Sequence, residues 1–159
     1  MNVIERKTAV LFAAATRLAA HLAGASEPVQ DNMAAYGMHL GLAFQIADDV
    51  LDYTGDADAL GKNLGDDLAE GKATLPLIHA MAHADDTLKQ RLRAIIEQGD
   101  GSAMPDVLAA IEAAGSLQYS IDKAQQHAQA AKAALVVVPD GAWKQALLEL
   151  ADYSVMRNH

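Results

Sequence analysis

The sequence contains no cysteine and few basic residues. The lack of cysteine excludes disulfide bonds and thiolate zinc sites, and it is compatible with a reducing compartment, so we expect a cytoplasmic protein. The chain has only 12 Lys and Arg residues but 21 Asp and Glu residues, which gives a formal net charge of −9. A surface that binds nucleic acid needs clustered Lys and Arg. Nucleic acid is therefore not an expected partner.

Long hydrophobic runs are also missing. The most apolar N-terminal stretch, residues 9–25, is interrupted by Arg17 and His21. It is shorter than the roughly 20 apolar residues that a transmembrane helix requires. We therefore expect neither a membrane span nor a signal peptide.

Aromatic residues make up only 4% of the 159 residues, whereas hydrophobic residues, with much alanine, make up 52%. This balance favours closely packed helices over sheet. We expect an all-α helical bundle, and the length suits a single domain over residues 1–159. Apolar periodicity and breakers predict a polar loop at 54–72 and helices at 3–22, 26–53, 74–83, 86–97, 105–114, 116–137 and 140–157.

The predicted helix 26–53 carries an acidic stripe near its end. Gln45, Asp48, Asp49 and Asp52 occupy positions i, i+3, i+4 and i+7, so they share one face. The glycines at 37 and 41 lie further along that face. Because buried unpaired anions are costly, we interpret the stripe as facing water or cations rather than as a packing seam. The opposite flank is apolar, with Leu42, Ile46, Val50 and Leu51.

The order Asp-Asp-x-x-Asp places carboxylate oxygens one helical turn apart. Mg²⁺ accepts such hard ligands and completes its octahedron with water and substrate phosphates, which would let an acidic protein bind a diphosphate. The pattern alone fits a solvated helix end in an acidic chain equally well. The neighbouring sequence is needed to choose between a metal site and a solvated helix end.

The neighbouring sequence resembles the trans-isoprenyl diphosphate synthase family, in particular the C-terminal half of its octaprenyl and related long-chain members. The resemblance is densest over residues 41–76 and extends, more weakly, over nearly the whole chain. The strings that carry it are Lys7-Thr8-Ala9, Gly41-Leu42-Ala43-Phe44-Gln45-Ile46-Ala47-Asp48-Asp49-Val50-Leu51-Asp52-Tyr53, Leu60-Gly61-Lys62-Asn63-Leu64-Gly65-Asp66-Asp67-Leu68 and Glu70-Gly71-Lys72-Ala73-Thr74-Leu75-Pro76.

The resemblance implies an isoprenoid synthase-like helical bundle. In such a bundle Mg²⁺ helps an allylic diphosphate, such as farnesyl diphosphate, to ionise, and isopentenyl diphosphate then attacks. The product would be a long-chain polyprenyl diphosphate for quinone side chains. The implied metal residues are Asp48 as direct ligand, with Asp49 and Asp52 acting through water or a neighbouring ligand.

The resemblance also implies substrate-binding and catalytic residues. Gln45 would lie beside the reacting allylic carbon, Lys7 and Lys62 would hold the allylic diphosphate, and Lys72 would close the site from the loop. Thr8 would be a neighbour that packs or forms hydrogen bonds. Spacing alone would instead make Lys62 and Lys72 solvated charges that balance an acidic loop.

The sequence departs from the family at one important point. The family has two aspartate-rich motifs facing each other, whereas residues 48–52 form the only Asp-Asp-x-x-Asp here. We expect an incomplete bundle that lacks the N-terminal half, has no catalytic activity by itself, and covers its apolar faces by forming a homo-oligomer. Either the chain is part of a complete synthase, or it is a noncatalytic relative that acts as a helical interaction subunit.

Overall fold

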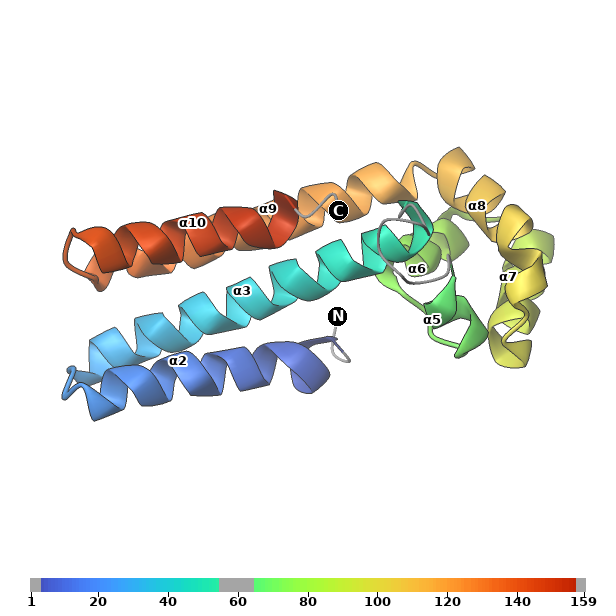
Figure 1. Ribbon diagram of the computed structural model, residues 1–159. Helices are drawn as coiled ribbons and strands as arrows, with labels where there is room; N and C mark the ends of the chain where they lie inside the picture. Colours follow the sequence, from blue (N-terminus) through green and yellow to red (C-terminus); the bar gives the residue numbers. More distant parts are fainter. Residues whose placement is uncertain (1–3, 55–64, 157–159) are drawn as a thin grey trace. The chain divides into compact units, whose positions relative to one another are not determined.

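The computed structural model describes residues 4–54 and 65–156 (Figure 1). Within these ranges every regular element is helical and none is a strand, which confirms the all-α prediction. None of the described helices is long and apolar enough to cross a membrane. The elements are η1 (Glu5–Ala9), α2 (Val10–Leu22), α3 (Glu27–Thr54), α5 (Asp66–Ala69), α6 (Leu75–His83), α7 (Asp86–Gln98), η2 (Gly101–Ala103), α8 (Met104–Ala113), α9 (Ser116–Ala134), η3 (Leu135–Val137) and α10 (Ala142–Met156).

Most predicted helices are present within a residue or two of their expected ends. The long helix of residues 26–53 is α3, 28 residues without interruption. Three details differ from the sequence prediction. The first helix opens with a five-residue π-helix, η1; the polar loop contains the short helix α5; and the predicted helix 116–137 ends in a 3-10 turn at residues 135–137.

The chain divides into two compact units. Among the described residues, one comprises 4–47 and 122–156, and the other comprises 48–54 and 65–121. Helix α3 begins in the first unit and ends in the second. The expectation of a single domain is not tested by this division and remains a prediction.

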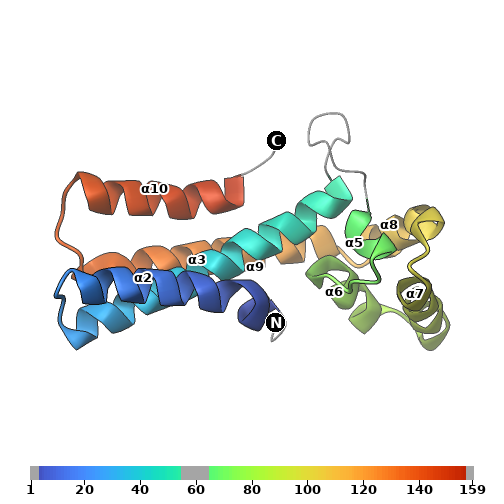
Figure 2. The same cartoon turned by 60° about the horizontal axis from the view of Figure 1, so that its bottom comes forward.

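The first unit consists of two pairs of neighbouring helices. Figures 1 and 2 show α2 beside the first part of α3, and α9 beside α10. Its core contains Tyr36, Leu40 and Leu135, all at most 5% exposed. The Tyr36 hydroxyl donates to the Leu147 carbonyl oxygen at 2.9 Å, which ties α3 to α10. Burial raises the pKa of Tyr36 to about 12, so this donor keeps its proton at neutral pH.

Two glycines of α3 allow α2 to pack closely against α3. A Cβ on Gly37 would overlap Thr16 Oγ1 and the Phe12 carbonyl oxygen, and a Cβ on Gly41 would lie 2.7 Å from Ala9 Cα. The Thr16 hydroxyl also donates across the seam to the Met33 carbonyl oxygen at 2.6 Å. The interpretation of this glycine-bearing part of the stripe as open to water or cations was therefore wrong. It is a packing seam, because small residues let two backbones come close.

The second unit has its own core. It includes Leu68, Leu77, Leu92, Val107 and Ile111, each fully buried, which come from α5 to α8. Helix α7 is bounded by clear signals. The Asp85 side chain caps its first turn by accepting from the Leu88 N–H at 2.8 Å, and Gly99 ends it with φ at +60°.

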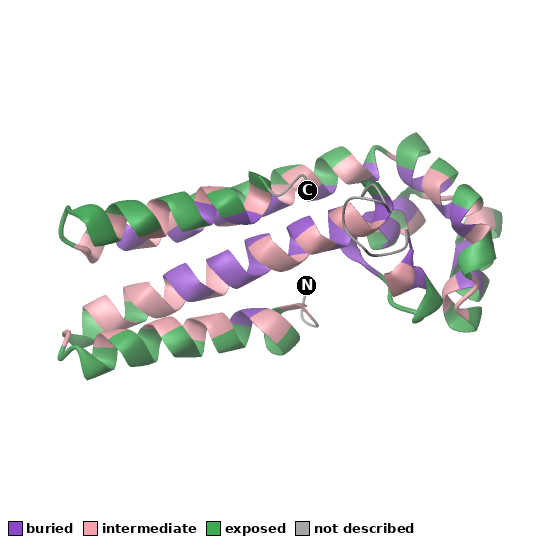
Figure 3. Cartoon of the chain, viewed as in Figure 1, coloured by how far each residue is buried: buried purple, intermediate pink, exposed green. Residues whose placement is uncertain are grey.

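Burial is distributed unevenly among the helices. Figure 3 shows buried positions along α3, whereas α2 and α10 have exposed outer faces. Three of the four residues of the apolar flank predicted for α3 are buried, since Leu42, Ile46 and Val50 are at most 7% exposed, whereas Leu51 is only partly buried. The exposed faces nevertheless include large apolar side chains: Leu11, Leu18 and Leu22 on α2, and Trp143, Leu150 and Tyr153 on α10.

Candidate active site

The three aspartates of the stripe occur in one uninterrupted helix but in different environments. Asp48 is partly exposed, whereas Asp49 is only 4% exposed. The Leu75 N–H donates to Asp49 Oδ2 at 3.3 Å. Leu75 is the first residue of α6, so this carboxylate accepts one of the N–H groups that a helix cannot satisfy internally. Its negative charge also suits the positive end of the helix dipole.

Asp52 contacts the segment that leads into α5. Its Oδ1 lies 3.5 Å from the Asp67 N–H, and its main-chain oxygen accepts from the Gly65 N–H at 3.2 Å. The carboxyl end of α3 is therefore tied to two later segments of the second unit. The aspartates that sequence analysis assigned to metal also organise residues 65–75.

A buried hydroxyl pair lies beside these aspartates. The Tyr53 phenol and the Thr74 hydroxyl are 2.6 Å apart, and both side chains are buried. Burial raises the pKa of Tyr53 well above its ordinary value, so the phenol stays protonated and serves as a hydrogen-bonding group rather than as a base. Thr74 directly precedes α6. Sequence analysis missed the pair, although Thr74 before Leu75-Pro76 is a helix-start signal.

Lys72 is held by acidic neighbours in its own segment. Its Nζ lies 2.8 Å from Asp67 Oδ1 and 2.7 Å from Glu70 Oε2. Hydrogen bonds to these two carboxylates raise the pKa of Lys72, so the ammonium stays charged. In this arrangement Lys72 balances the acidic loop. A diphosphate would have to compete with Asp67 and Glu70 for it.

The remaining described site residues belong to the first unit. Lys7 and Thr8 lie in the π-helix η1, where Lys7 is exposed. The Thr8 hydroxyl donates to Gln45 Oε1 at 3.0 Å, so these two predicted neighbours of the substrate are brought together. Short π-helical segments often mark functional sites because the extra residue redirects side chains.

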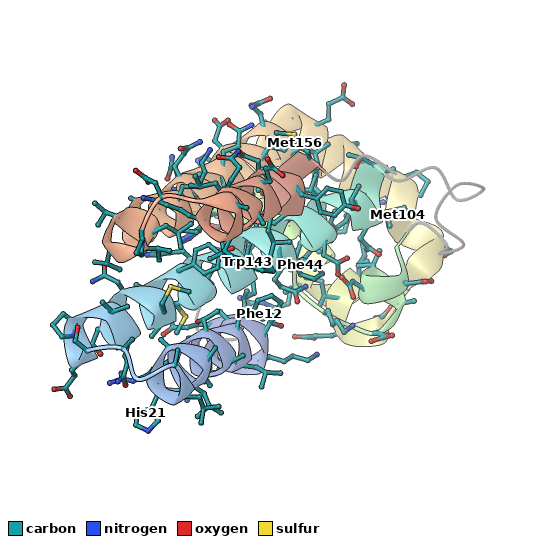
Figure 4. All side chains as sticks on the ribbon, turned by 60° about the vertical axis from the view of Figure 1, so that its left-hand side comes forward. Phe12, His21, Phe44, Met104, Trp143 and Met156 are labelled. Carbon is teal, nitrogen blue, oxygen red and sulfur yellow. The ribbon has the colours of Figure 1, made fainter. Side chains whose placement is uncertain are left out.

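An aromatic pair also joins α2 to α3. The Phe12 and Phe44 rings lie 6.0 Å apart between α2 and α3, and both are labelled in Figure 4. Sequence analysis treated Phe44 only as core and did not pair it with Phe12. The predicted residue Lys62 lies outside the described residues.

The donor set distinguishes between kinds of metal site. No three Asp, Glu, His or Cys side chains within residues 4–54 and 65–156 converge as a metal cage. Structural zinc sites need such a cage. Mg²⁺ does not, because it is held by one or two carboxylates and takes its other ligands from water and phosphates. The partly exposed Asp48 carboxylate fits that second kind of site.

Comparisons with known proteins show the family to which the chain belongs. The polyprenyl synthetase family profile matches residues 1–114. The chain therefore belongs to the polyprenyl synthetase family. It is 47% identical over 159 residues to the octaprenyl diphosphate synthase of Escherichia coli, a match that covers 99% of this chain and 49% of the relative. It is 41% identical over 157 residues to a nonaprenyl diphosphate synthase of Rhodobacter capsulatus, with 99% and 48% covered.

Solved structures give the same relationship. A Caulobacter crescentus polyprenyl synthase, crystallised with calcium and isoprenyl diphosphate, superposes with a TM-score of 0.89 at 42% identity, covering 99% of this chain and 48% of that one. A decaprenyl diphosphate synthase from Rhodobacter capsulatus also gives 0.89, at 40% identity, with 99% and 49% covered. The chain thus spans about half the length of the relatives that it matches.

Proposed function

We propose that this chain supplies one half of a long-chain trans-polyprenyl diphosphate synthase. The enzyme would condense an allylic diphosphate, such as farnesyl diphosphate, with isopentenyl diphosphate into a long-chain polyprenyl diphosphate for quinone side chains. The observation that carries the proposal is the aspartate stripe in an unbroken α3 of a polyprenyl synthetase fold. The complete protein would act in the cytoplasm as a homodimer, with residues 1–159 forming part of one domain.

Mg²⁺ would supply Lewis acidity for departure of the diphosphate. Asp48 would hold it directly, and Asp49 and Asp52 would act through water while keeping residues 65–75 in place. Diphosphate oxygens would complete the coordination.

The chain's other residues would bind and orient the substrate. Lys7 and Lys62 would fix the allylic diphosphate by charge, and Lys72 would join them after exchanging Asp67 and Glu70 for phosphate. The Gln45 side chain, oriented by the Thr8 hydroxyl, would place its polar end beside the allylic carbon.

The proposal also requires that the isolated chain be inactive, because the facing aspartate motif of the family is not in this sequence. The first test incubates the chain with Mg²⁺, farnesyl diphosphate and radiolabelled isopentenyl diphosphate, and extracts lipid-soluble products. We expect no chain elongation above background. Robust elongation would show that one aspartate motif is sufficient.

The second test joins the chain to the part of a relative that it does not match. The chain is fused to the part of the E. coli octaprenyl diphosphate synthase that it does not match, and products are sized by reversed-phase chromatography. We expect Mg²⁺-dependent elongation that is lost on Asp48→Ala. Asp31→Ala, on the same helix but in an exposed ion pair with Arg17, is the matched control and should retain activity.

The second candidate is a noncatalytic interaction subunit, which the exposed apolar side chains of α2 and α10 favour. A folded chimera that binds no substrate and makes no product would support this candidate over the synthase.

A further inference from the structure

An open groove of about 410 Å³ in the second unit is lined mainly by residues of α6 and α7. These two helices are neighbours in Figure 2. Its volume falls within the range of small-molecule pockets. The floor is apolar, with Ala73, Ile78, Met81, Ala82 and Ile96. Ile78 is 45% exposed, so apolar surface faces solvent here. The stripe aspartates, Lys72 and Thr74 do not line the groove, and Ala73 is its one lining residue that is adjacent in sequence to the candidate active site.

Two positively charged side chains of α7 line the groove. Lys89 and Arg93 are four residues apart on α7 and therefore share a face. Across the described ranges, 4–54 and 65–156, neither forms an ion pair. Arg91, which does not line the groove, pairs with Asp106. Glu97, four residues beyond Arg93, also lines the groove, so its three charged side chains carry a net charge of about +1. In a chain with 21 acidic and 12 basic residues, a net positive lining beside an apolar surface suits an anionic ligand.

We propose that the α6–α7 groove binds a single-chain amphiphile with a phosphate head and an apolar tail. The Arg93 guanidinium offers a planar fork of donors and Lys89 a compact charge, a combination that suits phosphate oxygens. The tail covers Ile78, Met81 and Ile96. Glu97, one turn beyond Arg93 on α7, repels the phosphate head and so places it at the Lys89 end.

The ligand is a dissolved amphiphile rather than a bilayer surface. The groove is concave and of limited volume, which suits one chain. A chain of net charge −9 is repelled by an anionic membrane, and two groove cations supply only about 1 kcal/mol of attraction each at such a surface.

Dodecyl phosphate, kept below its micelle-forming concentration, is the probe. The full chain is labelled with ¹³C at its methionine methyl groups and titrated by NMR, with dodecanol and dodecyltrimethylammonium as matched tails lacking the anion. We expect a saturable shift of the Met81 methyl signal, while those of Met33 and Met38 in the first unit stay in place. Both control ligands should bind about tenfold more weakly, as loss of two exposed charge contacts predicts.

Variants test the charges. Lys89→Gln with Arg93→Gln should weaken dodecyl phosphate binding about tenfold, whereas Arg91→Gln, on the same helix, should leave it unchanged. Glu97→Gln should tighten binding about twofold, because it removes the repelling carboxylate. Circular dichroism checks that each variant stays helical. Equal affinity for the three ligands, an unmoved Met81 signal, or an equal effect of Arg91→Gln would each overturn the proposal.

Discussion

At the packing seam between α2 and α3, replacing a glycine with alanine should change the free energy of unfolding through two physical effects of opposite sign. Gly37 lies inside α3, so replacing it with alanine raises helix propensity by about 1 kcal/mol. The added methyl group would, however, overlap Thr16 Oγ1 and the Phe12 carbonyl oxygen, and would lie 2.7 Å from the Phe12 carbonyl carbon. Two of these three atoms are main chain and cannot rotate away.

The steric effect should win. Relieving the overlap requires α2 to move outward, and overpacking of this kind costs about 1–3 kcal/mol, occasionally more. The movement also weakens the 2.6 Å bond from Thr16 to the Met33 carbonyl oxygen, for about 1 kcal/mol more. After the gain in propensity is subtracted, Gly37→Ala should lower the free energy of unfolding by about 2 kcal/mol.

Urea denaturation followed by far-ultraviolet circular dichroism measures this difference. With an m-value of roughly 2 kcal/mol per molar, the midpoint should fall by about 1 M. Gly101→Ala is the matched control, because its new methyl group would meet only Ala69 Cβ at 3.9 Å, and it should stay within about 0.5 kcal/mol of the parent. A Gly37→Ala protein as stable as the parent, or more stable, would refute the seam as described.

Three further predictions concern single groups. Asp49→Ala should destabilise the chain by about 1–3 kcal/mol in urea, because the buried Leu75 N–H loses its acceptor, with Asp49→Asn milder; an unchanged midpoint for Asp49→Ala would contradict this role. Tyr36→Phe should cost about 1 kcal/mol by removing the bond to Leu147, whereas Tyr153→Phe, 64% exposed, should be neutral. Burial, and then the nearby His39 and Lys123, lower the pKa of His127, whose Nδ1 lies 3.0 Å from that of His39. The His127 imidazole therefore binds a proton more readily in the unfolded chain than in the folded one. The neutral His127 therefore contributes stability above about pH 6.5, and this contribution is lost as the pH falls toward the lower pKa of the folded state. His127→Asn should flatten the corresponding decline in urea midpoints measured across pH.

The helical framework was predictable because its signals are local. Ser26, Glu27 and Pro28 mark the start of α3, and the single glycines at 37 and 41 are too isolated to end it before Gly55. The ends of α7 were equally clear, since Asp85 and Gly99 satisfy the terminal backbone groups through their own chemistry. Such features depend on a few neighbouring residues and need no knowledge of the tertiary structure.

Contacts between helices were not predictable in the same way. The π-helix around Lys7 and Thr8 has no sequence signature, because its bonding differs from an α-helix only by a shift of one residue. The pairing of His39 with His127 joins positions 88 residues apart. Gly37 and Gly41 show the same limit, because periodicity places them on the face of the aspartates but does not tell which part of that face another helix covers.

The aspartate stripe shows why a ligand set needs more than helical spacing. Asp48, Asp49 and Asp52 are equivalent by periodicity, yet Asp49 accepts from the main-chain N–H of residue 75 and Asp52 from that of residue 67. A carboxylate has about four lone-pair sites, so accepting one N–H bond does not prevent it from reaching a metal-bound water. It does fix the orientation of the carboxylate. Asp49 and Asp52 thus hold residues 65–75 at the carboxyl end of α3, and Asp48, partly exposed like Asp52, is the carboxylate that we propose as the direct ligand of a cation.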